Sequence, residues 1–347
     1  MIKSLTSLRG GFILFIFFHH CMNLYPGGGS MAVTFFFVLG GFSMTIGYKD
    51  RLLNPDFNYR QYITRRCIRF FPLHWLCLFL ALPFVIMSFS WLDIPTFILN
   101  SLLLQTWVPI KSFYFSFNQV SWYLADTMFF AVMFPFLGKW IIKANRNKRS
   151  LIAIFFVTLY TMVAIFLPVD LYHAVLYISP YMRLVDFVFG IFLALGYFSL
   201  REKPAKRFTN SALSQFIIIC LIVLLVVESC VYENARCFSV IYWPLIALLI
   251  LIASLSETSS GEGRFMENSY LQRLGDLSFV IFLTHQLVLR YVEFVFNRIM
   301  HFESVIIYVV ITLILTLLLS IIIDKYFIKP VTQWLSKKKL LSMTVQS

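Results

Sequence analysis

The sequence predicts an all-helical integral membrane protein, and three observations support this prediction. Of the 347 residues, 60% are hydrophobic and only 13% are charged, and the mean hydropathy is +0.81. A soluble globular chain of this length would need far more polar surface. Apolar runs of membrane-spanning length follow one another along the chain, separated by short Lys and Arg clusters. The net charge of +13 therefore indicates membrane topology rather than nucleic-acid binding.

Apolar runs of about 16 to 24 residues predict about ten membrane-spanning helices. Their ranges are 8–25, 31–48, 72–91, 119–141, 151–168, 181–199, 211–229, 239–255, 275–297 and 304–326. The stretch 95–109 is bracketed by prolines and would span only about 22 Å as a helix, so we expect it to be interfacial or re-entrant. We expect a single transmembrane domain, residues 1–335, followed by a short basic cytoplasmic tail, residues 336–347.

The distribution of basic residues predicts that both termini are cytoplasmic. With ten crossings, 24 of the 29 Lys and Arg residues fall on the cytoplasmic side, which agrees with the positive-inside rule. Counting 95–109 as a further crossing would move the cluster NRNKRS to the outer side. No small-residue cleavage site follows the first apolar run, so we expect the first helix to be retained.

Arg9 and His20 form the first candidate site. Eleven helical steps separate them, which places both side chains on one face and roughly 16 Å apart along the axis. We expect Arg9 at the mouth of the first crossing and His20 deep within it. Ionisable groups at membrane depth are costly unless they meet partners or water, so the pair indicates a functional site. The alternative is a histidine that only packs inside a bundle.

Arg65, Arg66 and Arg69 form a second candidate site, in the loop that we expect to lead into Pro72 at the start of the third crossing. In helical geometry Arg65 and Arg69 share one face, and Arg66 lies one step around. Guanidinium groups bind phosphate oxygens bidentately, so the cluster suits a polyphosphate at the cytoplasmic surface. The alternative is simple anchoring by the positive-inside rule.

Four further ionisable residues lie within predicted crossings. Asp126 is a lone carboxylate in an apolar helix and should pair with an arginine or histidine. Arg183 and Asp186, three apart on one helical face, predict a local ion pair, with partners on other helices as the alternative. His285, about ten residues into its predicted helix, is either a base or electrophile of a reaction or a packing residue.

The glycines and cysteines carry weaker signals. Gly27 to Gly29 lack the Lys and Ser/Thr of a phosphate-binding loop and predict a flexible outer turn. Gly40 and Gly41 favour close helix packing or the backbone approach of a ligand. The six cysteines show no metal-ligand spacing. Cys230 and Cys237 bracket the segment VYENAR, where a local disulfide and two separate thiols are both compatible with the sequence.

Five segments, in chain order, resemble the signatures of the membrane acyltransferase-3 family. LRGGFILFIFFHHC is similar to its Arg-x10-His motif, with His20 rather than His19 at the required interval. FFFVLGGF, RRCIRFFP, WYLADTMFFAVMFP and LGDLSFVIFLTH resemble its other motifs, so the resemblance covers the whole chain. Three positions depart from the family pattern, and they are Gly40 in place of Ser, Thr127 in place of Glu with Asp126 before it, and Ala131 in place of Tyr.

The resemblance implies a multi-pass O-acyltransferase of the bacterial cytoplasmic membrane. It implies that acyl-CoA, expected to be acetyl-CoA, donates to a hydroxyl of an extracytoplasmic or lipid-linked glycan, and that no cofactor is bound permanently. Arg9 and His20 take the essential positions, and Arg65, Arg66 and Arg69 would bind CoA. A glycan or lipid transporter whose buried charges line a path is the alternative from another class. A membrane O-acyltransferase of the Asn/His type would need a different arrangement of motifs.

Overall fold

The computed structural model describes residues 2–21, 24, 28–202, 211–231, 237–256, 268–300 and 304–344. Within these ranges the chain forms helices joined by turns and contains no strand. Nine helical segments of the described chain are long and apolar enough to cross a membrane. The predicted all-helical membrane architecture is therefore confirmed.

The helices that contribute to these nine segments follow one another along most of the chain. They are α2 (Gly28–Leu53), α3 (Tyr59–Ile86), α6 (Ser121–Lys143), α7 (Arg146–Phe166), α8 (Pro180–Arg201), α9 (Ser211–Val231), α10 (Trp243–Ser256), α11 (Ser269–Val295), α12 (Val305–Ile323) and α13 (Lys329–Thr344). The short turn η6 (Ser239–Tyr242) precedes α10, and the π-helical turns η8 (Phe296–Met300) and η9 (Asp324–Ile328) follow α11 and α12. The predicted tail thus begins inside α13 rather than after the last helix.

Helix α1 (Lys3–His20) accounts for the difference between the ten expected crossings and these nine segments. Its 18 residues begin with the polar stretch KSLTSLR, which lowers the hydropathy of the helix as a whole. The apolar run used for the prediction begins at Leu8 and extends to Tyr25, whereas the helix starts earlier and ends at His20. Asn23, Pro26 and the glycines that follow are poor helix formers, which is consistent with an end at that point.

The segment 95–109 forms short pieces and is not among the candidate spans. It contains most of α4 (Asp93–Ser101) and the 3-10 turn η1 (Gln105–Trp107), and α5 (Lys111–Tyr114) follows. A second interruption lies between α7 and α8, where η2 (Val169–Leu171) and the π-helical η3 (His173–Ile178) connect the two helices. As predicted, 95–109 is not long enough to be a full crossing, and its interfacial or re-entrant position stays a prediction.

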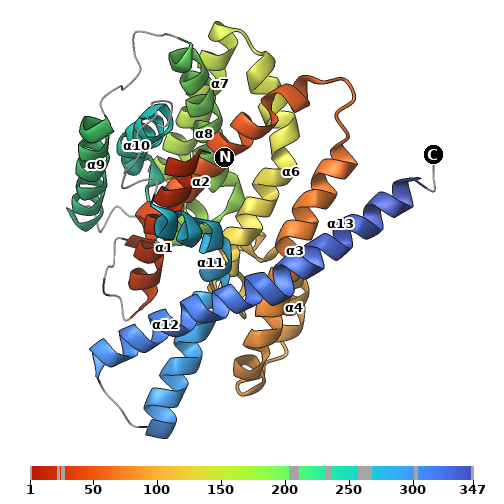
Figure 1. Cartoon of the computed structure of the whole chain (residues 1–347), viewed down its shortest axis with the longest axis vertical. Helices are drawn as coiled ribbons and strands as arrows, with labels where there is room; N and C mark the ends of the chain where they lie inside the picture. Colours follow the sequence, from red (N-terminus) through yellow and green to blue (C-terminus); the bar gives the residue numbers. More distant parts are fainter. Residues whose placement is uncertain are drawn as a thin grey trace. The chain divides into compact units, whose positions relative to one another are not determined.

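The chain divides into two compact units, each built from two stretches of sequence. The first unit contains Met1–Phe57 and Phe129–Asp276, and the second contains Asn58–Met128 and Leu277–Ser347. In the first unit α2 packs against α1 and α8, and α10 packs against α8 and α9 (Figure 1). In the second unit α3 packs against α4 and α13, and the Tyr291 hydroxyl on α11 donates to the Leu80 carbonyl on α3 at 2.8 Å.

Glycines allow the closest helix contacts of the first unit. A Cβ atom at Gly41 on α2 would overlap the Phe187 carbonyl of α8, and one at Gly190 on α8 would overlap the Val38 carbonyl of α2. The close packing predicted for Gly41 is confirmed, while a Cβ at Gly40 would make only an ordinary contact, 3.7 Å from the Phe187 ring. Small residues let membrane helices approach in this way.

Two local predictions were wrong. Helix α3 begins at Tyr59, so Pro72 lies within it rather than at its start. Prolines are tolerated inside membrane helices because neighbouring groups satisfy the freed backbone carbonyls. Gly28 and Gly29 are the first residues of α2 rather than part of an outer turn, and Gly27 lies outside the described residues. A helix start accommodates glycine because its first N–H groups need no intrahelical partner.

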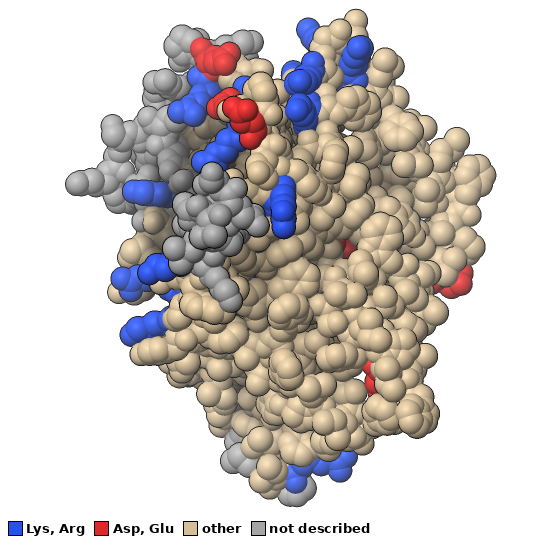
Figure 2. Space-filling view, turned by 90° about the vertical axis from the view of Figure 1, so that its right-hand side faces the viewer, with Lys and Arg blue, Asp and Glu red and all other residues tan. Residues whose placement is uncertain are grey.

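The surface agrees with a membrane environment. Many large apolar side chains are exposed, including Phe79, Ile86, Leu151, Phe166 and Ile306. Figure 2 shows wide areas of one face without Lys, Arg, Asp or Glu. Cys230 and Cys237 are not joined by a disulfide in the structure. Of the two alternatives that the sequence allows, the structure therefore contains two separate thiols.

Candidate functional site

Helix α1 carries both residues of the first candidate pair, and both are partly buried. His20 is the last residue of the helix, not a residue deep within it as predicted, because the helix starts at Lys3 and stops before the proline and glycines ahead. The first turns of α1 are held tightly within their unit. Ser4 donates to the Ala253 carbonyl of α10 at 2.7 Å, and a Cβ at Gly10 would lie 2.5 Å from the Leu271 carbonyl oxygen.

A backbone contact determines which nitrogen of His20 carries a proton. His20 Nδ1 lies 2.9 Å from the Ile16 carbonyl oxygen, one turn back along α1. A carbonyl only accepts, so Nδ1 is the protonated nitrogen and donates this bond. In a neutral ring Nε2 is then unprotonated. The backbone of α1 therefore leaves Nε2 as the acceptor nitrogen of the neutral His20 ring.

The adjacent His19 has a different environment. Its ring packs against the start of α2, where a Cβ at Gly29 would come within 2.6 Å of His19 Cδ2. The two imidazole rings lie edge to face with centroids 4.9 Å apart. His19 thus packs against the start of α2, in the space that the missing Cβ of Gly29 leaves.

The three arginines of the basic motif lie within helix α3, not in a loop. Arg65 and Arg69 are exposed and one turn apart, as their predicted shared face requires. Arg66 is partly buried, with its guanidinium 5.2 Å from the centre of the Tyr62 ring. A regular helix therefore presents two exposed guanidinium groups in line, and the third is held against an aromatic ring.

The predicted ion pair between Arg183 and Asp186 on α8 is present and completely buried. The guanidinium and carboxylate lie 2.9 Å apart, with side-chain exposures of 1% and 0%. Trp243 of α10 donates to Asp186 at 2.7 Å, and Arg183 donates to the Thr34 hydroxyl of α2 at 3.1 Å. The pair thus also joins three helices, which combines both alternatives left open by the sequence.

Aromatic rings enclose this ion pair. The Arg183 guanidinium lies 4.9 Å from the centre of the Phe37 ring and 5.5 Å from that of Tyr177. The Trp243 indole stacks on Phe189 with centroids 4.5 Å apart. A buried charge pair enclosed in this way fixes the arrangement of α2, α8 and α10.

Asp126 and His285 belong to the second unit, and both are fully buried. The predicted pairing of Asp126 with an arginine or histidine stays a prediction. His285 Nδ1 lies 2.7 Å from the Phe282 carbonyl oxygen and 3.1 Å from that of Ile281. Its Nδ1 is therefore protonated, and Nε2 is the acceptor nitrogen of the neutral ring, as in His20.

The segment before α6 is hydrogen-bonded to α11 on both sides of His285, through two side chains and one backbone carbonyl. Asn118 donates to the Leu283 carbonyl at 2.8 Å, and Gln286 donates to the Gln119 side chain at 2.7 Å. Arg290 donates to the Phe117 carbonyl at 2.9 Å. This polar clamp, Phe117 to Gln119 with its α11 partners, was not predicted, because residues far apart in sequence form it and no single motif contains them.

Two other buried polar residues were not predicted from the sequence for the same reason. His74 of α3 donates from Nε2 to the Asn100 carbonyl of α4 at 2.7 Å. The Tyr160 hydroxyl of α7 accepts from the Ser239 backbone N–H at 3.2 Å. Among the described residues, no group of three or more His, Cys, Asp or Glu side chains could hold a metal ion.

The comparisons with known proteins agree with these observations. Residues 2–325 match the acyltransferase domain of the acyltransferase-3 family. The chain is 25% identical over 283 residues to "Acyltransferase MdmB" of Streptomyces mycarofaciens, covering 76% of this chain and 69% of that protein. It is 25% identical over 305 residues to "Putative peptidoglycan O-acetyltransferase YrhL" of Bacillus subtilis (strain 168), covering 82% of this chain and 48% of that protein.

The family match includes all the candidate site residues described above. The chain spans about half the length of the Bacillus subtilis relative. No solved structure matches it. The family match covers Arg9, His20, the arginines of α3 and the buried groups of α6, α8 and α11. The chain therefore belongs to the membrane acyltransferase-3 family and is a multi-pass membrane acyltransferase.

Proposed function

We propose that this enzyme transfers an acetyl group from acetyl-CoA to a hydroxyl of a glycan, with His20 as the reacting base or nucleophile. The observation that carries the proposal is the bond from His20 Nδ1 to the Ile16 carbonyl at 2.9 Å. It leaves Nε2 as the unprotonated nitrogen, which is the form a general base requires. The name of the Bacillus subtilis relative, which includes peptidoglycan O-acetyltransferase, supports a glycan acceptor.

Direct transfer requires one proton transfer to His20 Nε2 and one proton transfer from it. Nε2 removes the proton of the acceptor hydroxyl, and the oxygen attacks the thioester carbonyl. The C–S bond breaks, and the CoA thiolate leaves and receives the proton from the imidazolium. The products are an O-acetyl ester and CoA, and His20 returns to its neutral form.

A two-step reaction uses the same nitrogen. Nε2 attacks the thioester carbonyl, the C–S bond breaks and CoA leaves as the thiolate; the acceptor hydroxyl oxygen then takes the acetyl group from the imidazole, and its proton passes to the thiolate to give CoA. In both routes Arg9 supplies positive charge on the same face of α1, and Arg65 and Arg69 offer guanidinium groups for the CoA phosphates. Trapping acetate on the purified enzyme in the absence of acceptor would distinguish the two routes.

The experiment that tests this function follows radiolabelled acetate from acetyl-CoA into peptidoglycan fragments. His20→Asn retains a nitrogen that can donate to the Ile16 carbonyl but lacks the base, so transfer should fall by about 100-fold to 10,000-fold. His19→Asn is the matched control and should keep most of the activity, because His19 contributes packing. Normal transfer by the His20→Asn protein would exclude His20 from the chemistry.

Surface glycan tests the proposed acetyl transfer in cells and distinguishes it from the transporter alternative that the sequence alone left open, which the family match does not favour. Cells without a transporter should have less glycan outside. Cells without the enzyme should keep the glycan and lose its base-labile acetate. Measuring both quantities in cells that carry His20→Asn therefore tests the covalent chemistry independently of the purified protein.

A further inference from the structure

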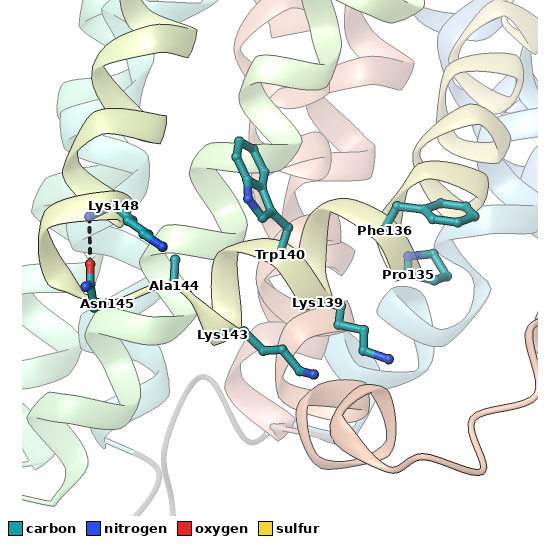
Figure 3. Close-up of a pocket in the computed structure, with 8 residues that line it drawn as sticks. All are labelled: Pro135, Phe136, Lys139, Trp140, Lys143, Ala144, Asn145 and Lys148. Atoms are coloured by element: carbon teal, nitrogen blue, oxygen red, sulfur yellow. Dashed lines mark hydrogen bonds between the residues drawn. The ribbon is translucent and has the colours of Figure 1, made fainter.

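A basic pocket lies at the turn between α6 and α7. Its volume is about 610 Å³, and its lining includes Phe136, Lys139, Trp140, Lys143 and Lys148 (Figure 3). All of these residues belong to the first compact unit. The sequence analysis used Lys139, Lys143 and Lys148 only to predict topology. The proposed acyl transfer does not involve them.

Two side chains fix the shape of this turn. Arg149 of α7 donates to the Ile141 carbonyl at 3.1 Å and to the Ile142 carbonyl at 2.7 Å, at the end of α6. The Asn145 side chain accepts from the Lys148 backbone N–H at 3.0 Å and caps the start of α7. Since Arg149 binds carbonyls and the helix start is capped, the positive charge available to a ligand comes from the three lysines.

Three lysines from the two helices that meet at this turn line the pocket. Lys139 and Lys143 are one turn apart on α6, and Lys148 reaches toward the turn from α7 (Figure 3). Within the described ranges no carboxylate forms an ion pair with any of them. Like charges one turn apart repel each other, so an anion bound among them would relieve that repulsion.

Along α6 the pocket lining begins with Phe136, continues with Lys139 beside Trp140 one turn later, and ends with Lys143. Phe136 and Trp140 are 59% and 54% exposed, and Lys143 lies seven residues, or about 10 Å, beyond Phe136. Only 11% of the apolar window of α7 is buried, so this helix presents its apolar side chains outward. Both helices are candidate membrane spans, which places their connecting turn at a membrane surface.

This combination of an apolar end, an exposed tryptophan and ammonium groups suits the groups of a phospholipid. Acyl chains can lie against Phe136 and the outward face of α7, the tryptophan lies at the level of the interface, and ammonium groups meet the phosphate. Basic pockets beside membrane helices bind anionic headgroups for these reasons. A soluble phosphate would use the lysines but would gain nothing from the exposed aromatic rings.

We propose that the pocket between α6 and α7 is a binding site for an anionic phospholipid, with Lys139, Lys143 and Lys148 around the headgroup. The test titrates the purified full-length protein with phosphatidylglycerol or phosphatidylcholine and counts bound lipids by native mass spectrometry. Phosphatidylglycerol should bind more tightly. Replacing all three lysines by alanine should weaken that binding about 100-fold, since each lysine near a headgroup contributes roughly fivefold.

The matched control replaces three exposed basic residues outside the pocket, Lys111, Arg146 and Arg201, by alanine. It removes the same charge and should change the affinity less than threefold. Arginine at the three lysine positions keeps the charge and should retain binding. If the triple alanine protein does not fold, Lys143→Glu alone, at an exposed position, should still weaken binding at least fivefold.

Three results would overturn the proposal. Equal loss of phosphatidylglycerol in the pocket variant and the control would mean that net charge alone attracts the lipid. Unchanged binding in the pocket variant would place the lipid elsewhere. Displacement of bound phosphatidylglycerol by inorganic phosphate at similar concentration would assign the pocket to a soluble phosphate. None of these measurements depends on acyl transfer.

Discussion

At the scale of single residues, the two histidines of α1 show what sequence and structure each contribute. The ten-residue interval from Arg9 is enough to select His20 over His19. The structure adds a physical difference, since the Ile16 carbonyl fixes the tautomer of His20 while His19 packs at Gly29. A tautomer depends on local backbone geometry, so no motif could have predicted it.

The buried ion pair leads to a prediction about stability. Arg183→Met leaves the Asp186 carboxylate buried without its cation, and the free energy of unfolding should fall by about 3–5 kcal/mol. The double variant Arg183→Met with Asp186→Asn removes both charges and keeps an acceptor for Trp243, so it should recover most of the loss. Unfolding of the detergent-solubilised proteins by heat or denaturant measures both. Equal destabilisation of the single and double variants would contradict this account.

At the scale of elements, the helix boundaries show the limits of hydropathy. The apolar run near 72–91 predicted a crossing, yet α3 starts at Tyr59 because its first turns are amphipathic and Asn58 caps them by accepting from the Gln61 backbone N–H at 2.8 Å. Hydropathy detects the part of a helix that lies in lipid. It does not detect a polar extension of the same helix into water.

The exposed arginines of α3 test the donor site. Arg65→Ala and Arg69→Ala should each raise the KM for acyl-CoA about tenfold to 100-fold, because a charge-assisted contact contributes roughly 1.5–3 kcal/mol. Arg60→Ala is the control, since Arg60 is exposed on the same helix outside the motif. Steady-state kinetics with donor and acceptor varied separately would locate the effect. A change confined to the KM of the acceptor would argue against a CoA site here.

The contact between α2 and α8 gives a prediction with an internal control. Gly41→Ala forces the Phe187 carbonyl and its helix to move, which should destabilise the protein by about 1–3 kcal/mol. At Gly47, six residues later on the same helix, a Cβ would have no neighbouring atom within 4 Å. Gly47→Ala should be neutral or stabilising by up to about 1 kcal/mol. Thermal unfolding of the two variants compares them directly, and equal effects would mean that packing is not responsible.

At the scale of the whole molecule, composition and charge correctly predicted an all-helical membrane protein. They could not predict the contacts between helices. The number of apolar runs follows from the chain alone. The bond from Trp243 to Asp186, and the clamp from Asn118 and Gln119 to α11, join residues whose proximity only the folded chain creates. The division into two compact units likewise leaves no mark in the sequence, because each unit combines separated stretches.

The predicted topology can be tested in intact cells. If α1 crosses the membrane in addition to the nine candidate spans, single cysteines at Leu24 and Asn147 lie on opposite sides of the membrane. In a background without native cysteines, a membrane-impermeant thiol reagent should label Leu24→Cys without permeabilisation and Asn147→Cys only after it. Both positions are exposed, so burial does not prevent labelling. Reaction at Asn147→Cys in intact cells would reverse the assignment of the α6–α7 turn.

Under the proposed function, the bond between His20 and its own helix has a consequence for turnover. Both the neutral ring and the imidazolium carry a proton on Nδ1, so the contact with the Ile16 carbonyl persists whether or not Nε2 holds a second proton. The ring therefore need not rotate when it receives or releases a proton. A catalyst of this kind avoids reorganisation between successive steps, and a single backbone oxygen one turn away is sufficient to provide that constancy.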